Sequence, residues 1–233
     1  MTDQPARYAL YYAPEADTPL WRFGSSVVGY DAVTGEDKSV PDFAGVLAER
    51  WLDLTSEPRK YGFHATLKAP FFLAVGVDEE ALKVALQRFA EKTPAVATVG
   101  LDVSPIGPFL ALTPLGDASE INALASLVVN HFDAFRAPLS TADRERRLKS
   151  PLTSRQTDYL DRFGYPYVHE EFRFHMTLTG PLHADDRGAM RKTLADAYSV
   201  EAAPGTLTID RICLFRQETP AARFRIIDSV RLT

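Results

Sequence analysis

The chain has 233 residues with a formal net charge of −5 at pH 7, and hydrophobic residues make up 45% of it. This length and this apolar fraction suit one sizeable globular domain and exclude a disordered chain. The negative charge disfavours a general affinity for long nucleic acid or for anionic membranes. The single cysteine, Cys213, excludes an internal disulfide and a cysteine-rich zinc site, and it fits a reducing compartment.

No segment is predicted to enter a membrane. The first residues contain acid and proline where a signal peptide needs an apolar stretch. No stretch approaches the roughly 18 apolar residues of a membrane span. We therefore expect a cytoplasmic protein without a membrane partner.

Strand and helix patterns alternate in the first half of the chain. Asp42 and Asp78 precede apolar residues at helical spacing and are expected to cap helices, whereas Pro70 is expected to end a strand. In chain order we expect a strand over 8–12, a loop with a short element over 18–35, a helix over 43–54, a strand over 63–68 and a helix over 78–93.

The second half continues the alternation. We expect strands over 96–103 and 109–113, a helix over 119–135, one or two helices over 138–164, a strand over 172–178, a helix over 185–200 and a strand pair over 207–215 and 223–232. The chain contains neither a flexible linker nor a low-complexity tract. A single domain over 1–233, with two closely packed halves, is therefore predicted.

One short segment occurs twice. Phe63–Pro70 and Phe174–Pro181 share five of eight residues, and their histidines, His64 and His175, lie 111 residues apart. Each copy precedes a predicted amphipathic helix. This spacing is too long for a solenoid repeat and indicates two duplicated lobes.

The alternation within each copy predicts a strand that lines a cleft. Residues two apart in a strand point to the same side, so His64, Thr66 and Lys68 are expected to share one face. Apolar residues lie at the positions between them. The corresponding polar face of the second copy consists of Arg173, His175, Thr177 and Thr179.

These residue types suit a reaction on a phosphodiester. One neutral imidazole can take a proton from water or a hydroxyl, while a protonated one gives a proton to the leaving oxygen. The hydroxyls of Thr66 and Thr177 can donate to non-bridging phosphate oxygens, and Lys68 and Arg173 can offset the charge there. Side chains would then supply every step, so neither a metal nor a cofactor is expected.

The paired His-x-Thr motifs resemble those of the two-histidine (2H) phosphoesterase superfamily, which has the LigT-like fold. A closer likeness is to a bacterial branch often encoded beside carbon–phosphorus lyase genes for phosphonate use. This likeness is carried by Arg7–Pro14, Tyr61–Phe71 and Phe172–Pro181.

The resemblance implies an α+β fold of two lobes related by a pseudo-two-fold axis, with two antiparallel sheets flanking a central cleft and helices outside. It implies that His64 and His175 are catalytic and that Thr66 and Thr177 bind phosphate. The usual chemistry of the superfamily is metal-free opening of cyclic nucleotide phosphates, or the reverse ligation. An extra segment is expected at about 132–167.

The predicted function is a metal-independent cyclic phosphodiesterase acting on a small ribose or nucleotide cyclic phosphate, with a role in phosphonate metabolism. One alternative is a 2H enzyme that processes or ligates the ends of short RNA, which an acidic chain disfavours. Another is a nucleotide- or phosphate-binding module without turnover. A zinc site is disfavoured because neither motif strand offers a His-x-His pair.

Three further features have two interpretations each. The basic run 144–147 is either a solvated helix face or a rim that attracts a phosphate-bearing substrate. Tyr12, Tyr165 and Tyr167 either pack in the core or stack on a base or ribose. The near-symmetric motifs leave open which histidine is the base and which is the acid.

Overall fold

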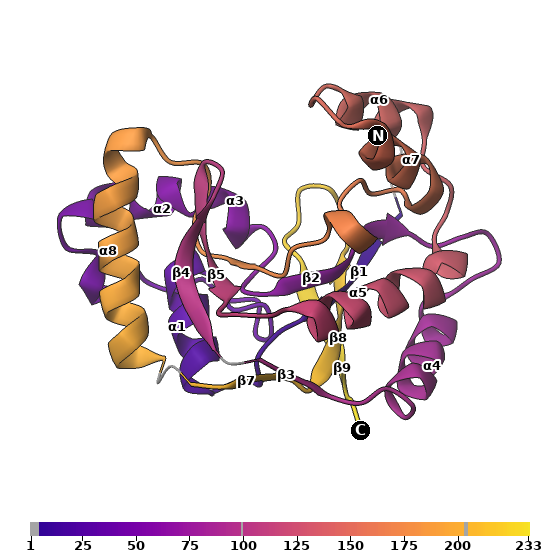
Figure 1. Ribbon diagram of the computed structural model, residues 1–233, viewed down its shortest axis with the longest axis horizontal. Helices are drawn as coiled ribbons and strands as arrows, with labels where there is room; N and C mark the ends of the chain where they lie inside the picture. The colour runs from indigo at the N-terminus through magenta and orange to yellow at the C-terminus, as the bar shows by residue number, and fades with distance from the viewer. Residues whose placement is uncertain (1–4, 99, 203–204) are drawn as a thin grey trace.

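The computed structural model describes residues 5–98, 100–202 and 205–233 (Figure 1). Its strands are β1 (Arg7–Tyr12), β2 (Ala65–Phe72), β3 (Val96–Thr98), β4 (Leu101–Ile106), β5 (Phe109–Pro114), β6 (Met176–Thr177), β7 (Leu207–Ile209), β8 (Arg211–Gln217) and β9 (Arg225–Arg231). Its α-helices are α1 (Pro19–Val28), α2 (Trp51–Leu54), α3 (Ser56–Arg59), α4 (Glu79–Ala90), α5 (Ser119–His131), α6 (Thr141–Leu148), α7 (Ser154–Phe163) and α8 (Ala184–Glu201). Short 3-10 helices are η1 (Asp42–Arg50), η2 (Asp133–Phe135) and η3 (His169–Glu171).

The strands form two antiparallel sheets. Seven of the described strands make one sheet in the order β4-β5-β6-β2-β1-β8-β9, and β3 pairs with β7 in the other. The predicted α+β class with antiparallel sheets is thus confirmed, whereas the two lobes and their pseudo-two-fold axis stay a prediction. The two motif strands, β2 and β6, are direct neighbours within the larger sheet.

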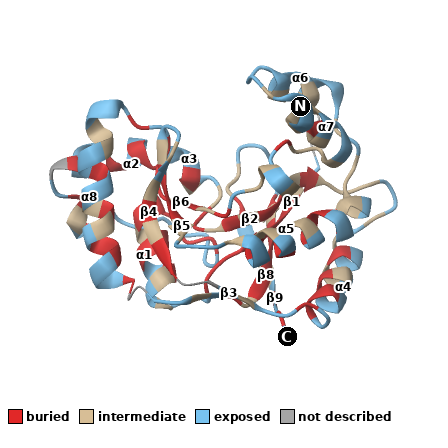
Figure 2. Cartoon of the chain, in the orientation of Figure 1, coloured by how far each residue is buried: buried red, intermediate tan, exposed pale blue. Residues whose placement is uncertain are grey.

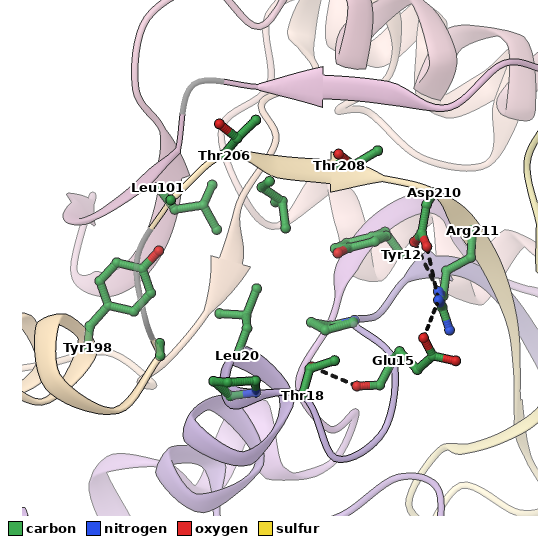
Figure 3. Close-up of a pocket in the computed structure, with 15 residues that line it drawn as sticks. Tyr12, Glu15, Thr18, Leu20, Leu101, Tyr198, Thr206, Thr208, Asp210 and Arg211 are labelled. Atoms are coloured by element: carbon green, nitrogen blue, oxygen red, sulfur yellow. Dashed lines mark hydrogen bonds and ion pairs between the residues drawn. The ribbon is translucent and has the colours of Figure 1, made fainter.

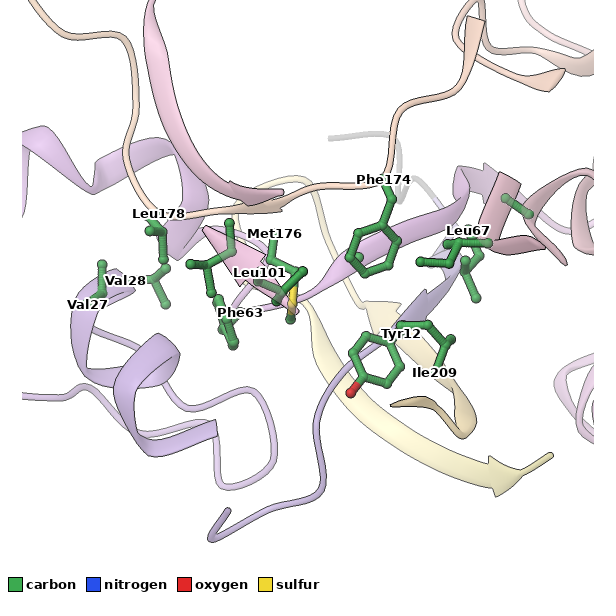
Figure 4. Close-up of a cluster of buried hydrophobic side chains, with 14 of the residues drawn as sticks. Tyr12, Val27, Val28, Phe63, Leu67, Leu101, Phe174, Met176, Leu178 and Ile209 are labelled. Atoms are coloured by element: carbon green, nitrogen blue, oxygen red, sulfur yellow. The ribbon is translucent and has the colours of Figure 1, made fainter. Parts of the chain in front are cut away.

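Helices cover one face of the larger sheet. α5 packs on β2, α8 on β4, and α4 on β8 and β9. Leu86, Leu124 and Leu194 of these helices are fully buried against the sheet residues of the main core. Burying such a side chain stabilises the fold by about 1.5–3 kcal/mol. Figure 2 shows the resulting buried band, and Figure 4 shows part of this core, including Phe63 and Met176.

A second, smaller cluster lies on the other face of the strands. It includes Ala9 and Tyr11 of β1, Cys213 and Phe215 of β8, and the aromatic ring of Phe224. Cys213 is 2% exposed, as expected for a small buried hydrophobe. This cluster supports the sheet face on which the polar residues of the motif strands are expected.

Two helical regions differ in how well the sequence predicts them. The Asp78 side chain accepts a hydrogen bond from the Ala81 amide at 2.8 Å and caps α4, as predicted. The helix expected over 43–54 is wrong: η1 and α2 divide it, and Gly45 has φ 51° and ψ −123°. That conformation suits glycine and interrupts the helix. The prediction of Asp42 as a side-chain cap also fails, since no side-chain cap bond is formed there.

The segment predicted as a loop with a short element over 18–35 holds a regular helix, α1. Thr18 caps it by accepting from the Trp21 amide at 3.2 Å, and Gly29 ends it with φ 73°. Buried Phe23 and Val27 hold the helix in the core. Tertiary packing thus overrides a weak local pattern.

Three strand boundaries also differ from expectation. Pro70 does not end β2, which continues to Phe72, because Pro70 is paired in neither ladder: it lies at a register shift against β1, and β6 pairs with β2 only at Ala65. The segment 96–103 divides into β3 and β4, which belong to different sheets. Within 172–178, only Met176–Thr177 forms regular strand.

Helices α6 and α7 form a small pair that projects from the body (Figure 1) and lies within the expected extra segment 132–167. Of their residues only Leu160 is buried. Arg136 holds the base of the pair, donating to the carbonyl of Arg162 at 2.9 Å and pairing with Asp133 at 2.9 Å. Among the described residues, no helix is both long enough and apolar enough to cross a bilayer.

Candidate active site

The two copies of the repeat meet in antiparallel register. Ala65 of β2 pairs with Met176 of β6, and each is the central residue of its His-x-Thr motif. Both side chains are completely buried in the main core. Their neighbours along each strand therefore point to the opposite face of the sheet.

In this register the histidine of each motif faces the threonine of the other motif. Continuing it by one residue in each direction places His64 across from Thr177 and Thr66 across from His175. Side chains directly opposite in an antiparallel pair have Cβ atoms about 4.5–5.5 Å apart. The histidine of each copy is therefore next to the threonine of the other, and the four polar groups form one patch.

Two cavities open on this patch and share four lining residues: Thr66, Ala69, Tyr165 and Tyr167. The first, of about 580 Å³, also contains His64 and Thr177. The second, of about 490 Å³, contains His175 and Arg173. The structure thus brings both histidines and both threonines to one cleft, with tyrosines of the segment 132–167 over them.

Backbone carbonyls orient both imidazoles. The Nδ1 atom of His64 lies 2.8 Å from the carbonyl oxygen of Gly62, and that of His175 lies 2.8 Å from the carbonyl oxygen of Arg173. A carbonyl oxygen only accepts, so Nδ1 carries the proton in each ring. In the neutral form each Nε2 then carries the lone pair that can accept a proton. The Nε2 of His64 lies 3.3 Å from the Thr66 hydroxyl, which donates to it.

Aromatic surroundings lower the basicity of His64. The ring of Tyr11 stacks on it, and the ring centroids of Tyr61 and Phe215 lie about 6 Å away. Burial lowers the pKa of His64 to about 4, with a smaller contribution from the charge of His175. Burial also lowers the pKa of His175. Both rings are therefore neutral near pH 7 in the free protein.

Lys68 does not share the face of His64, so that prediction is wrong. The register of β1 and β2 shifts between the pairs Tyr11–Thr66 and Leu10–Lys68, which leaves Leu67 as an extra residue. This bulge reverses the alternation and turns Lys68 toward the core, where it is 3% exposed.

The Lys68 ammonium is held in the core by acceptors away from both histidine cavities. It lies 3.2 Å from a carboxylate oxygen of Asp133 and donates to the carbonyl of Val129 at 3.4 Å. Burial lowers the pKa of Lys68 to about 8. Lys68 therefore acts in the packing of β2 against α5.

The polar face predicted for the second copy includes Arg173 but does not extend to Thr179. Arg173 is exposed and lines the cavity of His175. Thr179 is fully buried, and its hydroxyl accepts from the Leu110 amide at 3.0 Å. Thr179 thus fixes β5 beside the second copy and does not line either cavity.

Arg7 and Tyr11 contribute to the site without having been singled out from the sequence, and Arg147 belongs to the basic run 144–147 that was expected either on a solvated helix face or on a substrate-attracting rim. Arg7 and Arg147 line the His64 cavity, and Tyr11 stacks beneath His64. The signal for Arg7 and Tyr11 was present, because residues 7, 9 and 11 of one strand share a face. Tyr12 lies on the opposite face and packs in the core, which confirms one of its two interpretations.

A further cavity of about 310 Å³ lies on the core side of the sheet, beside Tyr12 and Tyr198 (Figure 3). Its charged groups are paired with each other: Arg211 lies 2.9 Å from Asp210 and 3.1 Å from Glu15. These charges are therefore satisfied without a ligand. Among the described parts of the chain, no group of three or more His, Cys, Asp or Glu side chains gathers closely enough to hold a metal ion.

Comparison with known proteins gives the chain a family. Two curated relatives are named "Ribose 1,5-bisphosphate phosphokinase PhnN": one from Janthinobacterium sp. (strain Marseille), 38% identical over 96% of this chain, and one from Laribacter hongkongensis (strain HLHK9), 32% identical over 94%. The chain spans about half the length of each, 50% in both cases.

Among solved structures, the chain is similar to E. coli LigT complexed with 3′-AMP, at 15% identity and a TM-score of 0.46 over 99% of both chains. The family described as "Protein of unknown function (DUF1045)" matches residues 66–225. Because this match covers more than half of the 233 residues, the chain belongs to the DUF1045 family.

Proposed function

We propose that this protein is a metal-independent phosphoesterase that opens the cyclic phosphate of a small ribose or nucleotide phosphate. The observation that carries the proposal is the crossed pair of motifs, which supplies two imidazoles and two hydroxyls to one cleft. One imidazole takes a proton from water as its oxygen bonds to phosphorus. The other gives a proton to the ring oxygen as the phosphorus–oxygen bond breaks. The product is a phosphate monoester.

The different surroundings of the two histidines favour different roles. His64 is stacked on Tyr11, and its pKa of about 4 keeps it neutral, as a base must be. His175 lies in the second cavity with Arg173. A bound phosphate anion next to an imidazole stabilises the protonated form, so His175 can carry the proton destined for the leaving oxygen. Thr66 and Thr177 would donate to the non-bridging oxygens.

The names of the curated relatives favour a ribose phosphate as the substrate. Ribose 1,5-bisphosphate is the compound on which a phosphokinase of that name acts. Opening the cyclic phosphate of a ribose that already carries another phosphate yields a ribose bisphosphate. Such a reaction would supply the phosphokinase, and it agrees with the role in phosphonate metabolism that the sequence resemblance implies.

The test is turnover of a substrate panel by EDTA-treated protein, followed by phosphorus NMR. The panel contains 2′,3′-cyclic nucleotides and cyclic phosphates of ribose. We expect ring opening that is lost in His64→Ala and in His175→Ala, with one regioisomer of the monoester formed. Turnover restored only by added metal would contradict the proposed mechanism. Saturable binding without product would favour a binding module instead, and turnover of oligonucleotides alone would favour an RNA-processing enzyme.

A further inference from the structure

The cavity that contains His64 is strongly basic. Three arginines line it, Arg7, Arg146 and Arg147, and no carboxylate is among its described lining residues. The chain as a whole has a net charge of −5, so this concentration of positive charge runs against its composition. Low-dielectric walls around like charges focus a positive potential into the cavity. An anion is therefore the expected occupant of this end of the cleft.

Arg147 lacks the partners that a guanidinium normally has. It lies in the last turn of α6, and its Cζ atom is 5.0 Å from the ring centroid of Tyr165. Its Nε atom is buried and has no hydrogen-bond partner among the described residues. Within the same residues, no carboxylate lies at ion-pair distance from it. A buried N–H without an acceptor is unfavourable, and a ligand oxygen would satisfy it.

Arg7 reaches the same cavity from the first strand. Its guanidinium donates to the neutral side chain of Gln217 and lies 5.5 Å from the ring centroid of Phe224. No carboxylate of the described chain pairs with it. Arg146 differs: it is 63% exposed and lies 2.7 Å from Asp143, so its charge is partly offset. Arg7 and Arg147 are therefore the main cationic groups available to a ligand.

A structural role explains only part of this arrangement. Basic side chains in the last turn of a helix interact favourably with the helix dipole, which accounts for Arg146 and Arg147 on α6. It does not account for Arg7, which comes from β1, 140 residues earlier in the chain than Arg147. Two unneutralised guanidiniums from distant segments meet in one cavity beside a candidate catalytic histidine.

We propose that Arg7 and Arg147 form an anion subsite that binds a second phosphate group of the substrate. This inference rests on the proposed function, because it concerns the same cleft. Guanidinium forks bind phosphate with parallel charge-assisted hydrogen bonds. A cavity of about 580 Å³ accommodates a sugar with two phosphates. The cyclic ester lies at His64, and the second phosphate lies at the arginines, between Tyr165 and the body of the protein.

The test compares two substrates that differ in one group: a nucleoside 2′,3′-cyclic phosphate with a 5′-hydroxyl and the same compound with a 5′-phosphate. For the wild type we expect a KM at least tenfold lower with the 5′-phosphate. Arg7→Gln and Arg147→Gln should each raise that KM by about ten- to a hundredfold. For the 5′-hydroxyl compound both variants should raise KM much less than for the 5′-phosphate compound, so the ratio of the two KM values should approach one. Arg147→Lys keeps the positive charge but loses the two parallel N–H donors of the guanidinium. Its KM for the 5′-phosphate compound should lie between those of the wild type and Arg147→Gln.

Arg162→Gln is the matched control, since Arg162 lies in the same extra segment, is 63% exposed and pairs with Asp158 at 3.6 Å. Arg162→Gln should leave kcat and KM for both substrates unchanged. Equal KM values for the two compounds in the wild type, or equal losses on both in Arg147→Gln, would overturn the subsite.

A binding measurement separates this proposal from the proposed function. Ribose 1,5-bisphosphate and ribose are titrated calorimetrically into the wild type and into Arg147→Gln. Tight binding of the bisphosphate that weakens at least tenfold in Arg147→Gln supports the subsite even if no cyclic phosphate is turned over. If turnover depends on the histidines but Arg147→Gln binds the bisphosphate as tightly as the wild type, the subsite is refuted. The proposed reaction is then still supported.

Discussion

The aromatic ring of Tyr11 stacks on the imidazole of His64, with ring centroids 3.9 Å apart and planes inclined by 19°. Tyr11 is 1% exposed and belongs to the cluster that supports the cleft face of the sheet. The stack covers one side of the imidazole and keeps water from it. The depressed pKa of His64 is therefore a consequence of how β1 and β2 pair.

The pH dependence of turnover should report both lowered histidine pKa values. His64 must be neutral to act as the base, so kcat/KM should fall as the pH drops toward about 4. His175 must be protonated, and its pKa lies below 6.5, so kcat/KM should fall as the pH rises through a value below 6.5. We expect a bell-shaped profile with its maximum on the acid side of pH 6.5. A maximum above pH 8 would contradict this assignment.

Tyr11→Ala should shift the acid limb of the pH profile of kcat/KM. Water that enters the space left by the ring would stabilise the protonated form of His64 and raise its pKa toward 6.5. The acid limb of kcat/KM should then shift to higher pH, while the alkaline limb stays in place. Tyr11→Phe is the control and should leave both limbs unchanged. The measurement is the pH profile of kcat/KM for the three proteins.

The two cleft threonines should matter for rate, and Thr179 should matter for stability. Thr66→Val and Thr177→Val each remove a donor to the phosphate and should cost about 1–3 kcal/mol of transition-state stabilisation. Thr179→Val instead leaves the buried Leu110 amide without its acceptor. It should lower the free energy of unfolding by about 1–3 kcal/mol and leave kcat near the wild-type value. Wild-type kinetics in both cleft variants would mean that their hydroxyls do not contact the phosphate.

Lys68→Met should retain turnover. The ammonium of Lys68 is buried beside Asp133, so it is not available to a phosphate in the cleft. A buried ion pair replaced by an apolar side chain is often neutral for stability, and here Arg136 remains paired with Asp133. Asp133→Ala should lower the free energy of unfolding by about 3–5 kcal/mol, because it leaves the buried charge of Lys68 without its carboxylate partner. A loss of kcat above a hundredfold in folded Lys68→Met would show that Lys68 does bind phosphate.

Gly24 of α1 controls the position of the residue before His64. A Cβ atom at Gly24 would lie 2.1 Å from the ring of Phe63, which is fully buried. Gly24→Ala should therefore displace Phe63, destabilise the protein by at least 1–3 kcal/mol, and reduce kcat through His64. Gly188→Ala on α8 is the control, since a Cβ there meets nothing within 4 Å. It should leave kcat unchanged and raise stability by about 0.4–1 kcal/mol in urea unfolding.

The duplication made the core of the candidate site predictable from the sequence. Two copies of one alternating pattern define the same face twice, and the cleft contains His64, Thr66, His175 and Thr177 as predicted. The α+β class, in contrast, was predicted from the family resemblance. The side chains of a strand alternate between its two faces, so the first and third residues of each His-x-Thr motif point to the same side.

The same pattern fails two residues later because a bulge depends on the partner strand. Nothing in the local sequence shows that Leu67 is an extra residue in β2, so the orientation of Lys68 was not predictable. The convergence of Arg7 and Arg147 was hidden for a related reason. The two residues lie close together only because the folded chain brings α6 over β1. A contact between residues 140 positions apart leaves no local pattern in the sequence.

The central claim is that His64 and His175 act together as a proton-transfer pair, and a double-mutant cycle tests it most directly. kcat/KM for a cyclic phosphate is measured in the wild type, His64→Ala, His175→Ala and the double variant. We predict that each single variant loses roughly 10²- to 10⁴-fold and that the double variant is little slower than the worse single one. Activity within about tenfold of the wild type in either single variant would contradict the claim, as would independent, multiplicative losses in the double variant.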